Sequence, residues 1–164
     1  MMTRTKVFLL LGSNIGDKKQ QLENAVKLIH KECGLVKKKS SIYETEPWKV
    51  EGQEVYYNMA IEIETTFTPD LLLARIKRIE KELGREKREK WAPREIDIDI
   101  LFFGRKVIKQ KDLQIPHPHM HERNFAILPM MEIAPEFKHP LLHHNMEELY
   151  LRSKDNYEVV ILGK

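Results

Sequence analysis

Asp97 and Asp99 are the residues of this sequence whose types and spacing most clearly suggest chemistry. They alternate with isoleucines in the segment 96–103. On a β-strand, residues two apart point to the same face, with Cα atoms about 6.6 Å apart. Two carboxylates directed at one point repel each other unless a cation lies between them, and Mg²⁺ typically takes one or two carboxylates plus substrate phosphates. The pair therefore predicts a magnesium site, although a solvated strand face explains an isolated Asp-x-Asp pattern equally well.

The positive charge of the chain is concentrated just before this strand. Nine Lys or Arg and four Glu lie from Arg75 to Arg94, a charge of +5 against +3 for all 164 residues. The segment 85–95 is charged, has no apolar period and contains Pro93, so we expect a long loop. Its arginines can donate two hydrogen bonds to one phosphate, and Trp91 offers a flat surface for a base or excludes water. A solvated, ion-paired loop is the alternative, but cations beside metal-binding carboxylates favour a polyphosphate site.

Three further motifs are less specific. The segment 12–16 (Gly-Ser-Asn-Ile-Gly) lacks the ending of a P-loop and the spacing of a dinucleotide-binding loop, so alone it predicts a turn between strand and helix. Tyr56 and Asn58 share a strand face, where a ring and an amide could bind a flat heterocycle, although edge packing is the commoner explanation. Histidines at 117, 119 and 121 alternate without ligands at zinc spacing, so we favour scattered surface histidines over a zinc site.

Composition narrows the class of protein. With 164 residues, of which 41% are hydrophobic and 32% charged, the chain has the size of one globular domain, residues 1–164. Its apolar stretches are far shorter than the roughly 18 residues of a membrane helix, and the first one is too short for a signal peptide. Cys33 is the only cysteine and cannot form an internal disulfide, which favours the reducing cytoplasm.

The elements that must position these residues follow from periodicity and helix caps. One strand candidate, 55–66, alternates apolar and polar residues, so we expect one of its faces in the core and the other in water. The order β-α-β-β-α-β predicts a ferredoxin-like α+β sandwich, an antiparallel sheet with two helices on one face, followed by a C-terminal extension. The expected strands are 6–11, 36–44, 55–66, 96–103 and 157–162, and the expected helices are 17–33, 68–83 and 122–132.

Together, these motifs resemble the 6-hydroxymethyl-7,8-dihydropterin pyrophosphokinase family over nearly the whole chain and in the right order. The most specific stretch is residues 91–101, Trp-Ala-Pro-Arg-Glu-Ile-Asp-Ile-Asp-Ile-Leu. The other matching segments are Leu11 to Asp17, Tyr43-x-Thr45-x-Pro47, Tyr57-Asn58, Leu83-Gly84-Arg85, Ile115 to Pro118, Arg123-x-Phe125 and Glu132 to Pro135.

The resemblance implies that the protein transfers pyrophosphate from ATP to 6-hydroxymethyl-7,8-dihydropterin in folate biosynthesis, giving the pterin diphosphate and AMP. It implies that Asp97 and Asp99 hold two Mg²⁺ ions and that Arg85 and Arg94 are catalytic. The residues that it places at ATP are Glu80, Arg88, Trp91, Arg94, Ile100, His117 and Arg123. The residues that it places at the pterin are Thr45, Trp48, Tyr56, Asn58 and Phe125, with Gly12, Ser13 and Asn14 as support beside the pocket.

The chain departs from the family pattern at a few positions, none of them in the aspartate pair. Ala92 replaces a glycine before Pro93, and the segment 85–91 is one residue shorter than a common form of this loop. Pro118 stands where an aromatic residue is often found, and Asp112 and Gln114 replace an arginine and a threonine of some members.

Two other functions each explain part of the sequence. A small α+β sandwich with a basic loop and aromatic faces can bind single-stranded RNA, but the aspartates would then repel the phosphates. A metal-dependent phosphohydrolase explains Asp97 and Asp99 but not the stacking pair, Tyr56 and Phe125. No side chain stands out as a general base, so positioning and electrostatics would carry the rate. We expect a cytoplasmic monomer that binds ATP and the pterin, but no nucleic acid and no membrane.

Overall fold

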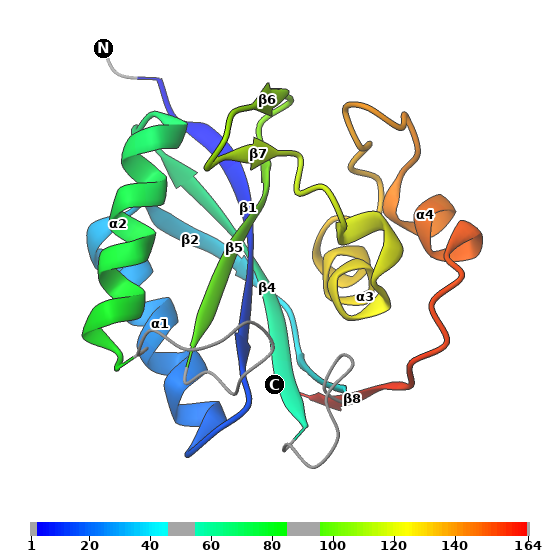
Figure 1. The fold of residues 1–164 in the computed structure, drawn as a ribbon, viewed down its shortest axis with the longest axis horizontal. Helices are drawn as coiled ribbons and strands as arrows, with labels where there is room; N and C mark the ends of the chain where they lie inside the picture. Colours follow the sequence, from blue (N-terminus) through cyan, green and yellow to red (C-terminus); the bar gives the residue numbers. More distant parts are fainter. Residues whose placement is uncertain (1–2, 46–54, 85–95, 164) are drawn as a thin grey trace.

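The computed structural model describes residues 3–45, 55–84 and 96–163 (Figure 1). Within these ranges, six strands form an antiparallel sheet in the order β5-β1-β4-β3-β8, and β2 pairs with β4 as well. The predicted α+β fold is confirmed, and the β-α-β-β-α-β order holds when β2 and β3 are taken together as its second strand. The strands of this sheet are β1 (Thr5–Ser13), β2 (Leu35–Lys39), β3 (Ile42–Thr45), β4 (Tyr56–Thr65), β5 (Asp97–Phe103) and β8 (Val159–Gly163). The helices are α1 (Lys18–Glu32), α2 (Pro69–Glu82), α3 (Asn124–Ile133) and α4 (Met146–Arg152), with a 3-10 turn η1 (Met120–Glu122) and a hairpin of β6 (Ile108–Lys109) and β7 (Gln114–Ile115).

Helices α1 and α2 cover one face of the sheet and begin at the predicted caps. The Asp17 carboxylate accepts a hydrogen bond from the Gln20 amide at 3.1 Å, and the Thr68 hydroxyl accepts one from Leu71 at 3.3 Å. Each helix buries an apolar stripe against the strands, with Leu22, Ala25 and Ile29 on α1 and Leu72, Ile76 and Ile79 on α2. None of the helices in the described ranges is long and apolar enough to cross a membrane.

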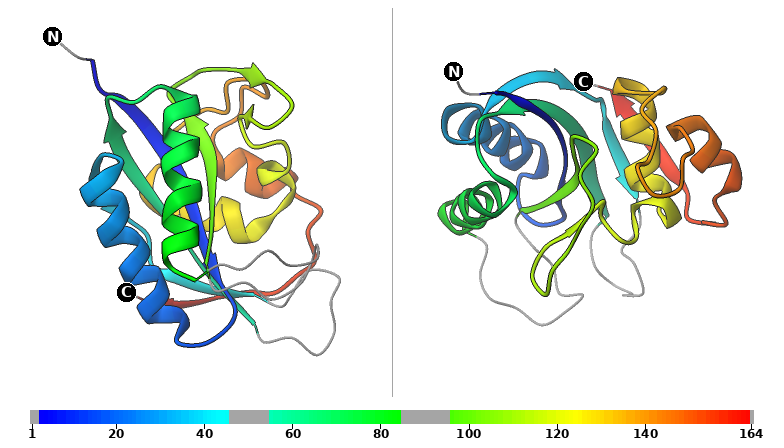
Figure 2. Two further views of the ribbon diagram at one scale, coloured as in Figure 1. Left: turned by 60° about the vertical axis from the view of Figure 1, so that its left-hand side comes forward. Right: turned by 90° about the horizontal axis from the view of Figure 1, so that it is seen from above.

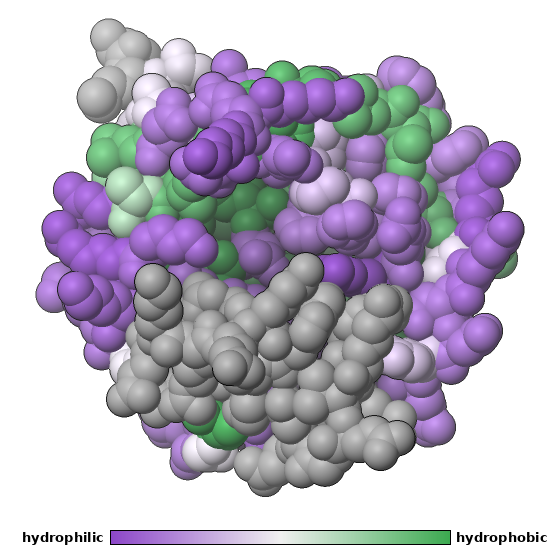
Figure 3. Space-filling view, in the orientation of Figure 1, coloured by the Kyte–Doolittle hydropathy of each residue, from purple (hydrophilic) through white to green (hydrophobic). Residues whose placement is uncertain are grey.

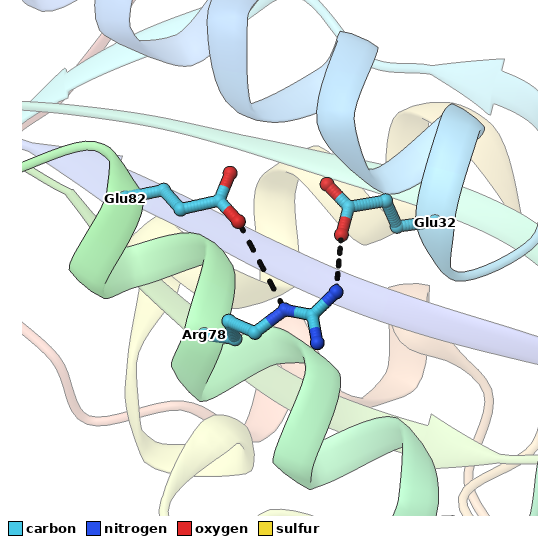
Figure 4. Close-up of polar contacts among 3 residues, drawn as sticks. All are labelled: Glu32, Arg78 and Glu82. Atoms are coloured by element: carbon cyan, nitrogen blue, oxygen red, sulfur yellow. Dashed lines mark hydrogen bonds and ion pairs between the residues drawn. The ribbon is translucent and has the colours of Figure 1, made fainter.

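Arg78 links the two helices on their outer surface (Figure 4). Its Nη2 lies 3.2 Å from a carboxylate oxygen of Glu32 on α1, and its Nε lies 3.9 Å from Glu82 on α2. The Arg78 side chain is 58% exposed, so solvent screens both ion pairs. The Arg78–Glu32 pair joins the two helices, the Arg78–Glu82 pair lies within α2, and both contribute little stability.

The prediction that one face of β4 is exposed to water is wrong. Ala60 is fully buried and Glu62 is 5% exposed, because α3 covers the face opposite α1 and α2, with α4 packed on its outer side (Figure 2). A second core lies there, in which Phe8, Leu10 and Phe102 pack with residues of α3 and α4. The physical reason is that β1 is apolar on both faces, so both faces of the sheet need a cover.

Three other elements differ from the prediction. The expected strand 36–44 is two strands, because Ser40 interrupts it: its hydroxyl accepts a hydrogen bond from the Ala60 amide at 2.9 Å in place of a strand carbonyl. Helix α3 begins at Asn124 instead of 122, after η1. Helix α4 was not predicted, although Asn145 and Glu148 form a capping box at its start that the sequence pattern could have indicated.

Candidate active site

Strand pairing brings the predicted site residues into one row across the sheet. Gly12 of β1 pairs with Asp97 of β5 on one side and with Asn58 of β4 on the other. Because residues paired across a sheet share a face and neighbouring strands lie about 4.8 Å apart, Asp97 and Asn58 face the same side with Cα atoms roughly 10 Å apart. Thr45 and Tyr56 pair with each other in the next row on this face. Asp97 and three of the predicted pterin contacts, Thr45, Tyr56 and Asn58, therefore lie on one face of the sheet.

Asp97 and Asp99 lie on one face of β5, as predicted. Both are partly exposed, whereas Ile96, Ile98 and Ile100 fill the core on the opposite face. Burial raises the pKa of Asp99 above its ordinary range, and the charges of Asp97 and Glu80 raise it further. A carboxylate whose proton affinity is raised by neighbouring carboxylates fits a divalent cation, whose charge would favour its ionised form.

Glu80 lies behind this pair, at the free edge of β5. Its side chain is 2% exposed, and its Oε2 accepts a hydrogen bond of 2.8 Å from the Ile98 amide, between the two aspartates. Its Oε1 lies 3.4 Å from the Lys77 ammonium group. The structure thus places Glu80 against the backbone that carries the aspartates.

His117 and Arg123 lie on the same side of the molecule as the aspartates. The Nδ1 of His117 accepts a hydrogen bond from the His119 amide at 3.1 Å, which leaves Nε2 to carry the proton. Burial, and then the charges of Arg123 and His119, lower the pKa of His117 to about 4, so the ring is neutral near pH 7. The positive charge of Arg123 opposes the raised pKa of Asp99, so these two groups interact electrostatically.

Two of the predicted pterin contacts, Asn58 and Thr45, are buried at one end of this row. The Asn58 amide group donates a hydrogen bond of 3.4 Å to the Thr45 hydroxyl, and both residues are at most 5% exposed. A Cβ at Gly12 would lie 2.7 Å from Oδ1 of Asn58, so only glycine leaves space for this amide. The requirement for glycine at 12 was missed in the sequence, where the residue indicated only a turn.

Phe125 lies in the first turn of α3 and packs against the second core. The Arg123 guanidinium lies 5.8 Å from the centroid of the Phe125 ring, so the start of α3 supplies one cationic and one aromatic group. Tyr56 is partly exposed on β4, on the sheet face that α3 covers. Tyr56 and Asn58 alternate along β4 and therefore share this face.

Several predicted site residues are not among the side chains that the structure brings together here. Ile100 is 7% exposed and its side chain packs in the core on the α1 and α2 side, so only its backbone is available to a ligand. Trp48, Arg85, Arg88, Trp91 and Arg94 lie outside the described residues.

Figure 3 shows a hollow with an apolar floor between α2 and the β6–β7 hairpin, beside β5.

In the part of the chain that the structure describes, no group of three or more His, Cys, Asp or Glu side chains is placed to hold a metal ion. A cation at Asp97 and Asp99 would therefore share those two carboxylates and take further oxygen ligands from substrate phosphates and water. This is the usual coordination of Mg²⁺ in phosphoryl-transfer sites. The two carboxylates on one face fit such an ion.

Comparison with known proteins gives a consistent family match. The family model for 7,8-dihydro-6-hydroxymethylpterin-pyrophosphokinase matches residues 8–135. The chain is 40% identical over 142 residues to the 2-amino-4-hydroxy-6-hydroxymethyldihydropteridine pyrophosphokinase of Aquifex aeolicus, covering 87% of this chain and 88% of that protein. It is 45% identical over 130 residues to the Bacillus subtilis protein of the same name, covering 79% of this chain and 78% of the relative.

Longer proteins match over part of their length. The chain is 44% identical over 137 residues to the folic acid synthesis protein FOL1 of Dictyostelium discoideum, covering 84% of this chain and only 21% of that protein. Among solved structures, wild-type HPPK-DHPS of Plasmodium falciparum superposes with a TM-score of 0.74 at 19% identity, covering 93% of this chain and 45% of that one. At this identity the structural likeness supports the fold.

Proposed function

The chain belongs to the 7,8-dihydro-6-hydroxymethylpterin-pyrophosphokinase family, and we propose that it carries out the family's reaction over the row of residues from Asp97 to Asn58. It is an ATP-dependent diphosphotransferase that catalyses the pyrophosphokinase step of folate biosynthesis. In this reaction the hydroxymethyl oxygen of the pterin attacks the β-phosphorus of ATP, the pyrophosphoryl group is transferred, and AMP leaves.

The observation that carries this placement is the register of β5, β1 and β4. Asp97 and Asn58 both pair with Gly12, so a phosphate chain at the aspartates and a pterin at Asn58 would lie side by side with nothing larger than a glycine between them. A site that holds both substrates converts a bimolecular reaction into an effectively unimolecular one. Placement thus supplies much of the catalysis that a general base would otherwise provide.

On the phosphate side, we propose that Asp97 and Asp99 hold two Mg²⁺ ions. Bound there, the ions supply Lewis-acid polarisation and neutralise charge that develops on the phosphates. Arg123 donates charged hydrogen bonds to the same phosphates, and neutral His117 donates one through Nε2–H. Arg85, Arg88, Trp91 and Arg94 are assigned to ATP and to catalysis by family resemblance, with Glu80 near the nucleotide. The apolar hollow beside β5 fits the adenine ring.

On the pterin side, we propose that Tyr56 and Phe125 stack on the two faces of the heterocycle. Asn58 and Thr45 form hydrogen bonds with the polar edge of the heterocycle. Because both residues are buried, a ligand without matching groups would leave them unpaired, so these contacts select for the pterin. Trp48 is assigned to this pocket by resemblance. A phosphohydrolase would need no polar and aromatic groups to bind a heterocycle, so these residues favour pyrophosphoryl transfer over hydrolysis.

The test is one incubation of the full chain with ATP, Mg²⁺ and 6-hydroxymethyl-7,8-dihydropterin. AMP should form only when the pterin is present, in amounts equal to the pterin diphosphate, and chelation of the metal should stop the reaction. Formation of ADP, or release of phosphate that does not depend on the pterin, would contradict the proposal. Adding single-stranded RNA should change neither the rate nor the salt dependence.

We also propose that residues 1–164 act as one monomeric domain in the cytoplasm. Cys33 supports a reducing compartment: it lies buried at the end of α1, and burial raises the pKa of its thiol to about 11. Such a thiol is unreactive and serves packing. Sedimentation at micromolar concentration should give the mass of one chain, 19.5 kDa.

A further inference from the structure

Helix α3 starts without a cap of its own. Its N-cap residue is Arg123, whose side chain makes no capping hydrogen bond. The first amides of a helix have no partner within the helix and need one from elsewhere. The position of the α3 N-terminus is important because it carries Arg123 and Phe125, which the proposed function assigns to ATP and to the pterin.

Asp155 supplies the missing cap from a distant segment, after α4. Its Oδ2 accepts a hydrogen bond of 2.8 Å from the Asn124 amide, and its backbone carbonyl accepts one of 3.5 Å from the Asn124 side chain. Its Oδ1 accepts a hydrogen bond of 2.9 Å from the Tyr157 amide, which holds the carboxylate in place. A negative charge at this end of a helix is also favoured by the helix dipole.

The same segment continues to β3, the strand that carries Thr45. After Asp155 the chain runs past α3 and enters β8, as the red trace in Figures 1 and 2 shows. There Val159 pairs with Thr45, and Val160 pairs with Glu44 of β3. The segment 153–163 therefore contacts the start of α3, which carries Phe125, and β3, which carries Thr45. It lies beyond the family match, which ends at residue 135.

We propose that Asp155 is a positioning residue for the pterin pocket. By holding the Asn124 amide, its carboxylate fixes the start of α3, so that the Phe125 ring and the Arg123 guanidinium stand at a set distance from Thr45 and Asn58. Asp155 contacts neither substrate. The inference rests on the proposed function, since it assumes that Phe125 contacts the pterin.

Asp155→Ala tests the proposal when it is compared with Asn145→Ala. Asn145 caps α4 with the same kind of bond, accepting the Glu148 amide at 2.9 Å, but α4 carries none of the site residues. Both variants should lower Tm similarly, by about 3 °C, because each loses one helix cap. Only Asp155→Ala should raise the Kd for 6-hydroxymethylpterin, by about tenfold, measured by titration in the presence of a non-hydrolysable ATP analogue.

A conservative variant separates positioning from general destabilisation. Asp155→Asn keeps one acceptor oxygen for the two amides, so the Kd for the pterin should rise by only about threefold. Exposed Glu158 lies on the same segment, and Glu158→Ala should change neither Kd nor Tm.

An equal effect of Asp155→Ala and Asn145→Ala on the Kd for the pterin, or no effect of either, would overturn the proposal. If Asp155→Ala does not fold, Asp155→Asn decides: a lower Tm with an unchanged Kd would equally overturn it. A wild-type chain that binds no pterin and forms no AMP would instead overturn the proposed function.

Discussion

Asp97 and Asp99 are two carboxylates on one strand face, each in the field of the other, with buried Glu80 behind them. Such a cluster is stable in its ionised form only with a counter-charge. Asp97→Asn and Asp99→Asn keep the side-chain shape but remove that charge. We expect each to lower the rate of AMP formation by at least a thousandfold, while the Kd for the pterin stays within threefold of wild type.

The matched control is Asp70→Asn, an exposed aspartate in the first turn of α2. It should retain full activity. Near-normal turnover in either Asp97→Asn or Asp99→Asn would remove the basis for a metal site here.

Gly12 carries a second prediction at the scale of one residue. A Cβ at this position would lie 2.7 Å from Oδ1 of Asn58 and push the amide out of place. Gly12→Ala should therefore raise the Kd for the pterin about tenfold. In the background of Asn58→Ala, which removes the displaced group, Gly12→Ala should have little further effect, because the two changes act through one contact. Additive effects would show that Gly12 acts in some other way.

At the scale of elements, Glu132 docks the end of α3 on β3. Its carboxylate accepts hydrogen bonds from the Ser41 amide at 2.9 Å and from the Tyr43 hydroxyl at 2.7 Å. Glu132→Ala should lower the free energy of unfolding in urea by about 2 kcal/mol, since two buried donors lose a charged acceptor. Glu136→Ala, an exposed glutamate just beyond the helix, should change it by less than about 0.5 kcal/mol.

Arg78, which links α1 and α2, should contribute less stability than Glu132. Its two ion pairs are exposed and therefore screened. Arg78→Ala should lower the free energy of unfolding by less than about 1 kcal/mol and leave the rate of AMP formation unchanged. A loss as large as that of Glu132→Ala would show that the relative placement of the two helices depends on this residue.

At the scale of the whole molecule, His139 makes stability depend on pH. It is 3% exposed, and its Nδ1 accepts the amides of Leu141 and Leu142 at 3.1 Å each. Burial, and then the charges of His121 and His143, lower its pKa from 6.5 to about 4. Between these two values the unfolded chain binds a proton that the folded chain does not, so this contribution to stability is complete above pH 6.5 and is lost as the pH falls towards 4.

The measurement is urea unfolding at pH 7.5 and pH 5. His139→Asn keeps an acceptor for the two amides but cannot be protonated. From pH 7.5 to pH 5, wild type should lose about 2 kcal/mol more stability than this variant. Comparison with the variant is needed because the raised pKa of Asp99 acts in the opposite direction over this range. An equal loss in both proteins would contradict the assignment to His139.

Much of the fold could be predicted because its signals are local. The caps of α1 and α2 at Asp17 and Thr68, their apolar stripes and the alternation of β5 each depend on residues a few positions apart. Helix α4 has an equally local signal, the capping box of Asn145 and Glu148. The cover over the second sheet face was missed because it depends on α3 packing on strands far away in sequence.

The sequence by itself determined that Asp97 and Asp99 share a face, because side chains alternate along a strand, and the specific motif around them identified the family. Only the tertiary structure decided that Asn58 lies across β1 from Asp97, that Gly12 must be glycine, and that Asp155 caps the helix of Phe125. Local periodicity sets which way a side chain points. Contacts between distant segments depend on strand register and on how the layers pack, which no short stretch of sequence contains.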